Sequence, residues 1–277
     1  MKKLLTAIAV VALALAVPSA ASAFSLGDYT GGVTFDFVNW DVGTTYDADT
    51  SFEDGADGDA DSFGLVRVDT IDALGGNPLW QSTAANESLQ GWFYGLDDNT
   101  VDIGSDYSGT IESIGGYVDL YLVQGGQTLD PLAAPAPTTP MTGLSAPADQ
   151  WNATDGELFL RLEFVPGVVS SQNSTYFQDI TTITNPVFGT GQGYLSVVGG
   201  SHAALFDSNA YNDVFPNADF YFSDSFDDRG LTAEQQENGW TVFSDGKVTG
   251  KAVPEPATMM LLGVGLAGGA LVRRRRS

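Results

Sequence analysis

The residues best suited to chemistry are seven carboxylates within the fifteen-residue stretch DADTSFEDGADGDAD, at positions 47–61. Aspartates separated by Gly and Ala can fold their oxygens around one cation, and Ca2+ accepts about six to eight oxygen ligands in irregular geometry. The pattern therefore predicts a calcium site, with a solvated acidic loop that binds no ion as the alternative. The predicted ligands are Asp47, Asp49, Asp54, Asp57, Asp59 and Asp61.

The spacing of these carboxylates does not fit the EF-hand loop. With Asp57 as the first ligand, the sixth position is Ser62 instead of Gly and the twelfth is Val68 instead of Glu. Any calcium site here must therefore be a different kind of loop. Two further acidic groups are weaker versions of the same hypothesis, namely Asp97, Asp98, Asp102 and Asp106, and Asp224, Asp227 and Asp228.

The chain contains one histidine, His202, and no cysteine. These counts exclude disulfides, thiol catalysis, Cys-based zinc sites and a multi-histidine metal cage within the chain. A serine hydrolase would need His202 beside a Ser and an acid, but no G-x-S-x-G motif accompanies it, so we expect a structural or surface role. A glycoside hydrolase needs only two facing carboxylates, which leaves that class as a weak alternative. No catalytic residue is predicted.

Five tryptophans could provide stacking surfaces for sugar rings. In a β-rich protein such side chains are more often core residues, because each buries a large apolar area. We therefore expect most of them in the core, with a carbohydrate-binding face as the alternative. They are Trp40, Trp80, Trp92, Trp151 and Trp240.

The formal net charge is −24, and the body of the chain is still more acidic. Residues 24–252 contain five bases and 34 acids, a balance of 5 − 34 = −29. Nucleic acid binding needs clustered Lys and Arg to displace the counterions of phosphates, so nucleic acid is excluded as a partner. The excess of carboxylates favours solubility and the sharing of divalent cations.

Residues 1–23 have the parts of a secretory signal peptide. Lys2 and Lys3 precede an apolar run, and Ala21 and Ala23 supply the small residues that signal peptidase needs before its cut. Cleavage after Ala23 would leave Phe24 as the new N-terminus. The run is too short for an ordinary membrane anchor.

The segment 253–277 combines a Pro-Glu-Pro triplet, an apolar stretch and a basic cluster, in that order. Its marked residues are Pro254, Glu255, Pro256, Arg273, Arg274, Arg275 and Arg276. This order resembles the PEP-CTERM sorting signal of exported proteins in Gram-negative bacteria. The resemblance implies processing by an exosortase, transient anchoring in the inner membrane, and a host that makes exopolysaccharide, biofilm or floc. An ordinary single-span anchor that is never cut is the alternative.

A looser resemblance lies in the body of the chain. The phrases YGLDD, GGYVDLYLV and ADFYFSDSF are similar to those of uncharacterised PEP-CTERM proteins, including some linked to flocculation. This resemblance implies no active residue.

The segment 24–252 shows the period-two alternation of β-strands. Val33, Phe35 and Phe37 share one face of a predicted strand, and 158–164 alternates in the same way. We predict one all-β domain, an antiparallel β-sandwich of jelly-roll-like form, with a Pro-rich loop at 130–147 for which a linker is the alternative. A short helix is expected at 231–238. Further strands are predicted at 63–71, 90–96, 117–123, 193–198, 203–206, 218–223 and 239–243.

Together these features predict an exported, non-catalytic protein of the outer surface or extracellular matrix, associated with exopolysaccharide, biofilm or floc. Signal peptidase and an exosortase are its expected partners during export. The alternatives are a carbohydrate-binding module with a calcium-stabilised loop and a glycoside hydrolase. Ca2+ is the only cofactor for which the sequence offers a set of ligands.

Overall fold

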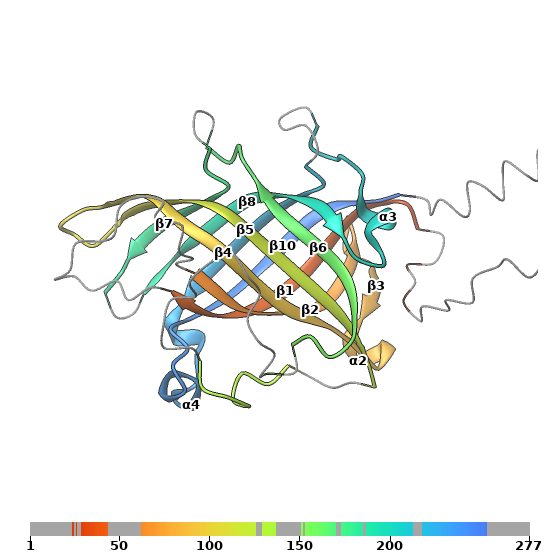
Figure 1. The fold of residues 1–277 in the computed structure, drawn as a ribbon, viewed down its shortest axis with the longest axis horizontal. Helices are drawn as coiled ribbons and strands as arrows, with labels where there is room; N and C mark the ends of the chain where they lie inside the picture. Colours follow the sequence, from red (N-terminus) through yellow and green to blue (C-terminus); the bar gives the residue numbers. More distant parts are fainter. Residues whose placement is uncertain are drawn as a thin grey trace, which may run out of the picture.

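The structure is a computed structural model. It describes residues 24, 26, 29–43, 62–125, 129–136, 151, 153–169, 173–184, 187–212 and 218–253. Its long strands run diagonally around a common axis, with short helices at the ends and on one side (Figure 1).

Ten strands and a few short helices make up the described chain. The strands are β1 (Gly31–Gly43), β2 (Ser62–Ala73), β3 (Pro78–Gln81), β4 (Glu87–Ile103), β5 (Gly109–Gln124), β6 (Glu157–Val165), β7 (Tyr176–Thr182), β8 (Phe188–Gly199), β9 (Phe220–Asp227) and β10 (Val242–Ala252). The helices are α2 (Ser82–Ala85), α3 (Ala203–Phe206), the 3-10 turn η1 (Asp228–Gly230) and α4 (Ala233–Glu237).

The strands close into an eight-stranded antiparallel barrel, so the predicted jelly-roll-like sandwich is wrong. The order is β1-β10-β9-β8-β6-β5-β4-β2, and β1 pairs with β2 from Val33 to Gly43 to complete the ring. At one end β7 replaces β6 between β5 and β8. Because β1 has a partner on both sides, the sheet has no free edge there, and one curved sheet encloses the core that two facing sheets would otherwise share.

Every second side chain along each strand points into the barrel and fills it. The predicted inward face of β1 is confirmed, because Val33, Phe35 and Phe37 are all buried in the main core cluster. Leu160, Leu162 and Phe164 of β6 lie in the same cluster. Side chains of the other phase point outward, so each strand separates an apolar interior from an outer face.

An aromatic plug closes the end of the barrel where β1 begins and β10 ends. Phe24, the predicted mature N-terminus, is 5% exposed, and its ring lies 4.6 Å from that of Phe159 in an edge contact. Phe206 of α3 packs against Phe35 with ring centroids 5.3 Å apart. The backbone N–H of Val253 donates to the carbonyl of Leu205, which joins the end of β10 to α3. In Figure 1 this end carries α3 and β3, and β7 lies at the other end.

A second core lies on the outer side of β1, β2 and β4. Residues 129–136, Trp151 and the segment around Trp240 cover the outward side chains of these strands. The indole N–H of Trp240 donates to the carbonyl of Pro131 at 2.7 Å, and the indole N–H of Trp151 donates to that of Ala134 at 2.8 Å. The first part of the Pro-rich segment is therefore fixed to the barrel wall.

Some of the predicted helices and strands are present in the structure and others are not. The helix expected at 231–238 is confirmed as α4, which begins with a capping box between Thr232 and Gln235. The strand predicted at 203–206 is instead the helix α3, and the strand predicted at 239–243 overlaps only the start of β10. Most of β10 was missed because its sequence, VFSDGKVTGKA, is rich in Gly and polar residues, and its place is set by pairing with β1 and β9.

Candidate functional site

The interior of the barrel contains a cavity of about 90 Å³. Most of its wall is aliphatic and aromatic. Representative lining residues from six strands are Phe35, Val68, Leu120, Leu162, Phe220 and Val248. A cavity with such walls favours an apolar guest over water.

Glycines on the inner wall make room for large side chains of neighbouring strands. A Cβ at Gly191 of β8 would collide with the hydroxyl of Tyr176 and with the carboxyl of Asp224. A Cβ at Gly246 of β10 would lie 2.7 Å from Cζ of Phe37. The large side chains of neighbouring strands occupy the room that these glycines leave.

One end of the cavity is polar. There β1 finishes and β2 begins, and the cavity is lined by Asn39, Asp41, Ser62, Gln178 and Asp224. The side-chain amide of Asn39 donates from Nδ2 to Oδ1 of Asp41 at 2.7 Å, and the hydroxyl of Ser244 donates to Oδ2 of Asp41 at 3.3 Å. The phenol of Tyr176 donates to Oδ1 of Asp224 at 3.2 Å. These side chains come from β1, β2, β7, β9 and β10, so only barrel closure brings them together.

Both carboxyl groups at this end resist ionisation. Burial raises the pKa of Asp224 to about 7, opposed by hydrogen bonds from Tyr176 and the backbone of Gly191. Burial also raises the pKa of Asp41 well above its ordinary value, and the negative charge of Asp224 raises it further. Asp224 is 8% exposed and Asp41 is half-buried. Removing a carboxylate from water disfavours its charged form, which explains why both pKa values are raised.

Among the residues that the structure describes, this polar end lacks a hydrogen-bond donor for one buried acceptor and a basic residue for its two carboxyl groups. Oδ1 of Asn39 is buried and accepts no hydrogen bond, although the residue is only 4% exposed. No Lys, Arg or His is present among the described residues that line the cavity, so neither carboxyl has a basic partner there. Buried carboxylates are rare unless they are paired, and a buried acceptor without a donor costs about 1–3 kcal/mol.

The predicted sites fall largely outside the described residues. This holds for the calcium ligands Asp47, Asp49, Asp54, Asp57, Asp59 and Asp61. It also holds for the processing residues Ala21, Ala23, Pro254, Glu255, Pro256, Arg273, Arg274, Arg275 and Arg276. These assignments therefore stay predictions.

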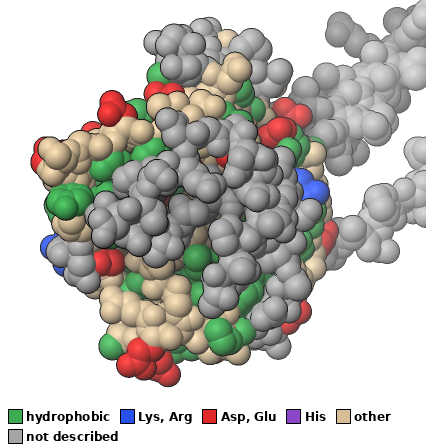
Figure 2. Space-filling view, turned by 60° about the vertical axis from the view of Figure 1, so that its left-hand side comes forward, with side chains coloured by type: hydrophobic (Ala, Val, Ile, Leu, Met, Phe, Trp, Pro, Cys, Tyr) green, Lys and Arg blue, Asp and Glu red, His purple; other side chains and the backbone are tan. Residues whose placement is uncertain are grey.

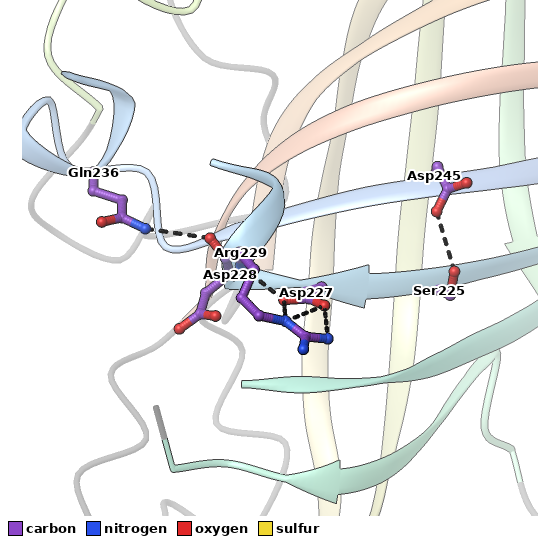
Figure 3. A network of polar contacts seen from close by, with 6 residues as sticks. All are labelled: Ser225, Asp227, Asp228, Arg229, Gln236 and Asp245. Carbon is purple, nitrogen blue, oxygen red and sulfur yellow. Dashed lines mark hydrogen bonds and ion pairs between the residues drawn. The ribbon is translucent and has the colours of Figure 1, made fainter. Parts of the chain in front are cut away.

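The two weaker acidic groups do lie in described segments, and they do not form metal sites. Within those segments, no three His, Cys, Asp or Glu side chains come together as metal ligands would. Asp224 points into the barrel, whereas Asp227 lies at the strand end, where its carboxylate pairs with Arg229 (Figure 3). Figure 3 also shows Gln236 bound to the carbonyl of Asp228, which ties α4 to η1. This cluster is a structural junction on the outside of the barrel.

His202 and the tryptophans have packing roles in the described structure. The imidazole of His202 stacks on Phe159 with centroids 4.5 Å apart and contacts Phe24 at the plugged end. All five tryptophans are buried, which confirms their predicted place in the core. Trp40 and Trp92 point outward from the barrel but are covered by the second core, so neither offers a ring face to a sugar.

Sequence reasoning missed Asn39 and Asp41 at the cavity's polar end and named Asp224 only within a weaker acidic group. A signal for them was present, because Asn39 and Asp41 continue the inward phase of Phe35 and Phe37 in FDFVNWD. Asp224 likewise interrupts the inward phase of Phe220, Phe222 and Phe226 in FYFSDSF. A polar residue in the buried phase of a strand marks either a structural hydrogen bond or a site.

The outer surface carries little free positive charge. Four of the five bases between residues 24 and 252 form ion pairs with aspartates in the described structure. On the face drawn in Figure 2, acidic side chains are spread around the periphery and basic ones are few.

Within the part of the chain that the structure describes, no helix has the length and hydropathy needed to cross a membrane. No curated protein and no solved structure matches the chain. Residues 252–276 match the family described as PEP-CTERM protein-sorting motif, which confirms the resemblance seen at the C-terminus. With this motif, the chain is a secreted surface protein that an exosortase processes during export.

Proposed function

We propose that this exported protein is a non-catalytic binding protein of the extracellular matrix, and that its barrel holds a small, mainly apolar molecule. The single observation that carries the binding role is the cavity of about 90 Å³ inside a closed β-barrel with apolar walls. Small-molecule sites in proteins are typically concave and apolar, with a few polar groups that fix orientation. Barrels of eight strands are wide enough to hold one small ligand.

Neutral apolar probes test this role. Benzene at about ten times its dissociation constant is expected to stabilise the folded state by about 1.4 kcal/mol, because mass action favours the state that binds. For a domain of this size the melting temperature should then rise by roughly 3–5 °C. Thermal unfolding with and without benzene measures this shift.

A cavity-filling variant provides the control. Val68 lines the cavity and is 2% exposed, so Val68→Phe is expected to occupy the space and abolish the benzene shift. Val198 is 48% exposed, and Val198→Phe should leave the shift unchanged. A wild-type protein that shows no shift with any neutral apolar probe would contradict a binding role for the cavity.

The matrix location rests on the sorting motif and on charge. The PEP-CTERM motif at 252–276 directs the protein to the surface, and the balance of −29 in residues 24–252 suits carboxylates that share divalent cations with acidic polysaccharide. The described structure offers no exposed tryptophan, which favours such contacts over a ring-stacking carbohydrate site.

Co-sedimentation with the host's own exopolysaccharide tests this second part. We expect retention of the exported form in the presence of millimolar Ca2+ and its release by a chelator, because chelation removes the bridging ion. Retention that is unaffected by the chelator would argue against cation bridging. Mass spectrometry of the recovered protein shows whether its C-terminus lies near residues 253–256.

A further inference from the structure

We propose that the polar end of the barrel cavity binds the primary ammonium group of a small organic amine whose apolar part occupies the rest of the cavity. This inference rests on the proposed binding function and adds the chemical class of the ligand. It is carried by Asn39, Asp41 and Asp224, which line the same end of the cavity from β1 and β9.

The hydrogen-bonding capacity of this end calls for a donor. Asn39 lines the cavity, its buried Oδ1 accepts no hydrogen bond, and its Nδ2 donates to Oδ1 of Asp41. The hydrogen bonds that Asp41 and Asp224 receive come from neutral amide and hydroxyl groups. An ammonium group has three donors and no acceptor, so it can donate hydrogen bonds to Oδ1 of Asn39 and to both carboxyl groups at once.

The charge of this end calls for a cation. Two carboxyls face one cavity, and among its described lining residues no base balances them. Charge-assisted hydrogen bonds are about twice as strong as neutral ones, and they gain further where water is excluded. A carboxylic acid guest would add a third acidic group and leave Oδ1 of Asn39 without a charged donor.

The apolar remainder of the cavity favours an organic cation over a metal ion. Phe35, Leu162 and Phe220 line the rest of the cavity and offer no oxygen ligand. Ca2+ needs about six to eight oxygens around it. An alkyl or aryl ammonium fills both halves of the cavity.

The test compares three probes of equal chain length, namely hexylamine, 1-hexanol and hexanoic acid, by calorimetry at pH 8 on the exported form of the protein. Hexylamine is expected to bind at least about tenfold more tightly than 1-hexanol, because only the amine forms charge-assisted bonds. Hexanoic acid is expected to be the weakest of the three. Benzene serves as the probe that tests the cavity alone.

Matched variants locate the effect. Asp224→Asn should reduce the ratio of hexylamine to hexanol affinity to near one and leave benzene binding intact. Asp245→Asn is the control, because Asp245 precedes Gly246, the pairing partner of Asp224 on β10, but is exposed on the outer face, bonded to Ser225 (Figure 3). If Asp224→Asn fails to fold, Asn39→Leu removes the free acceptor and should also lower the ratio.

The amine preference should also depend on pH. Asp41 from β1 and the phenol of Tyr176 from β7 face Asp224 inside the barrel, Asp245 acts on it from β10, and β8 presents only glycine backbone. At pH 5.5 the protonated carboxyls lose their attraction for the ammonium, so the affinity ratio should fall toward one.

Each other outcome overturns a defined part of the inference. Equal affinity for hexylamine and hexanol, with benzene still bound, rejects the amine class and leaves the binding function standing. Tighter binding of hexanoic acid, or displacement of hexylamine by millimolar Ca2+, also rejects it. Failure of all probes, benzene included, rejects both the ligand class and the binding function.

Discussion

At pH 8, Asp224→Asn is expected to stabilise the fold by up to about 4 kcal/mol. Burial raises the pKa of Asp224 from its ordinary value of 3.8 to about 7, so the folded state holds a proton that the unfolded state releases between these values. Each pH unit of that interval is worth about 1.4 kcal/mol. Asparagine removes the charge and keeps the oxygen that accepts from Tyr176.

The sign of the pH dependence follows from the same shift. Between about pH 4 and pH 7 the folded protein binds more protons than the unfolded chain, so the free energy of unfolding falls as pH rises. Above pH 7 the carboxyl is charged in both states and its contribution is constant. Urea unfolding at pH 5.5 and pH 8 should show a larger loss in the wild type than in Asp224→Asn, in which the raised pKa of Asp41 still contributes to the loss.

Asp245→Asn is the matched control for this experiment. It removes one negative charge from the outer face of β10, and should therefore leave most of the pH dependence in place. A wild-type protein equally stable at pH 5.5 and pH 8 would show that Asp224 is not the protonated buried acid that its surroundings require.

The second large effect is expected at the outer face of β5 and β6. Arg161→Met should lower the free energy of unfolding by about 3–5 kcal/mol, because it leaves a buried charge without its partner. Asp119 is fully buried, and Arg161 donates from Nε to its Oδ1 at 2.7 Å and from Nη2 to its Oδ2 at 2.6 Å. Methionine keeps the apolar stem and removes only the charge and the donors.

Tyr94 cannot replace the arginine. Its hydroxyl donates to Oδ2 of Asp119 at 3.3 Å, and burial, followed by the charge of Asp119, raises the pKa of Tyr94 to about 12. The phenol therefore stays a neutral donor. The double variant Asp119→Asn, Arg161→Met should recover most of the loss, because no buried charge remains.

Arg67→Met provides the comparison. Arg67 pairs with Asp69 at 2.9 Å, but both side chains are partly exposed, at 31% and 47%, so the loss of this pair should cost less than about 1 kcal/mol. Urea unfolding of the three variants measures these differences. An Arg161→Met loss as small as that of Arg67→Met would mean that Asp119 is satisfied without its arginine.

Much of the strand pattern could be predicted from the sequence. The alternation of Val33, Phe35 and Phe37 correctly identified the inner face of β1, and the burial of most of the tryptophans was anticipated from their size. Local patterns are reliable here because period-two alternation is a property of consecutive residues. The same reasoning failed at 203–206, where AALF supports either a strand or the short helix α3.

The closure of the sheet could not be predicted in this way. Alternating strands fit a sandwich and a barrel equally well, since both bury one face. The choice depends on the pairing of β1 with β2 on one side and β10 on the other, and β10 lies about two hundred residues further along the chain. Such pairings are set by packing among distant segments.

The candidate site was likewise predictable from the sequence only in part. Asn39 and Asp41 could be placed on the inward phase of β1 from FDFVNWD alone, but their proximity to Asp224 depends on β10 lying between β1 and β9 in the ring. Their burial, the raised pKa of Asp224 and the free Oδ1 of Asn39 are consequences of that closure.

By itself, the sequence determined that this protein is exported and which faces of its strands are apolar, because a sorting motif and an alternation are both read from neighbouring residues. Only the tertiary structure decided that the strands enclose a cavity, that a covering segment buries the outward tryptophans, and that two carboxyls share one interior. The physical reason is that these features arise between residues far apart in the chain, whose contacts exist only once the barrel has closed.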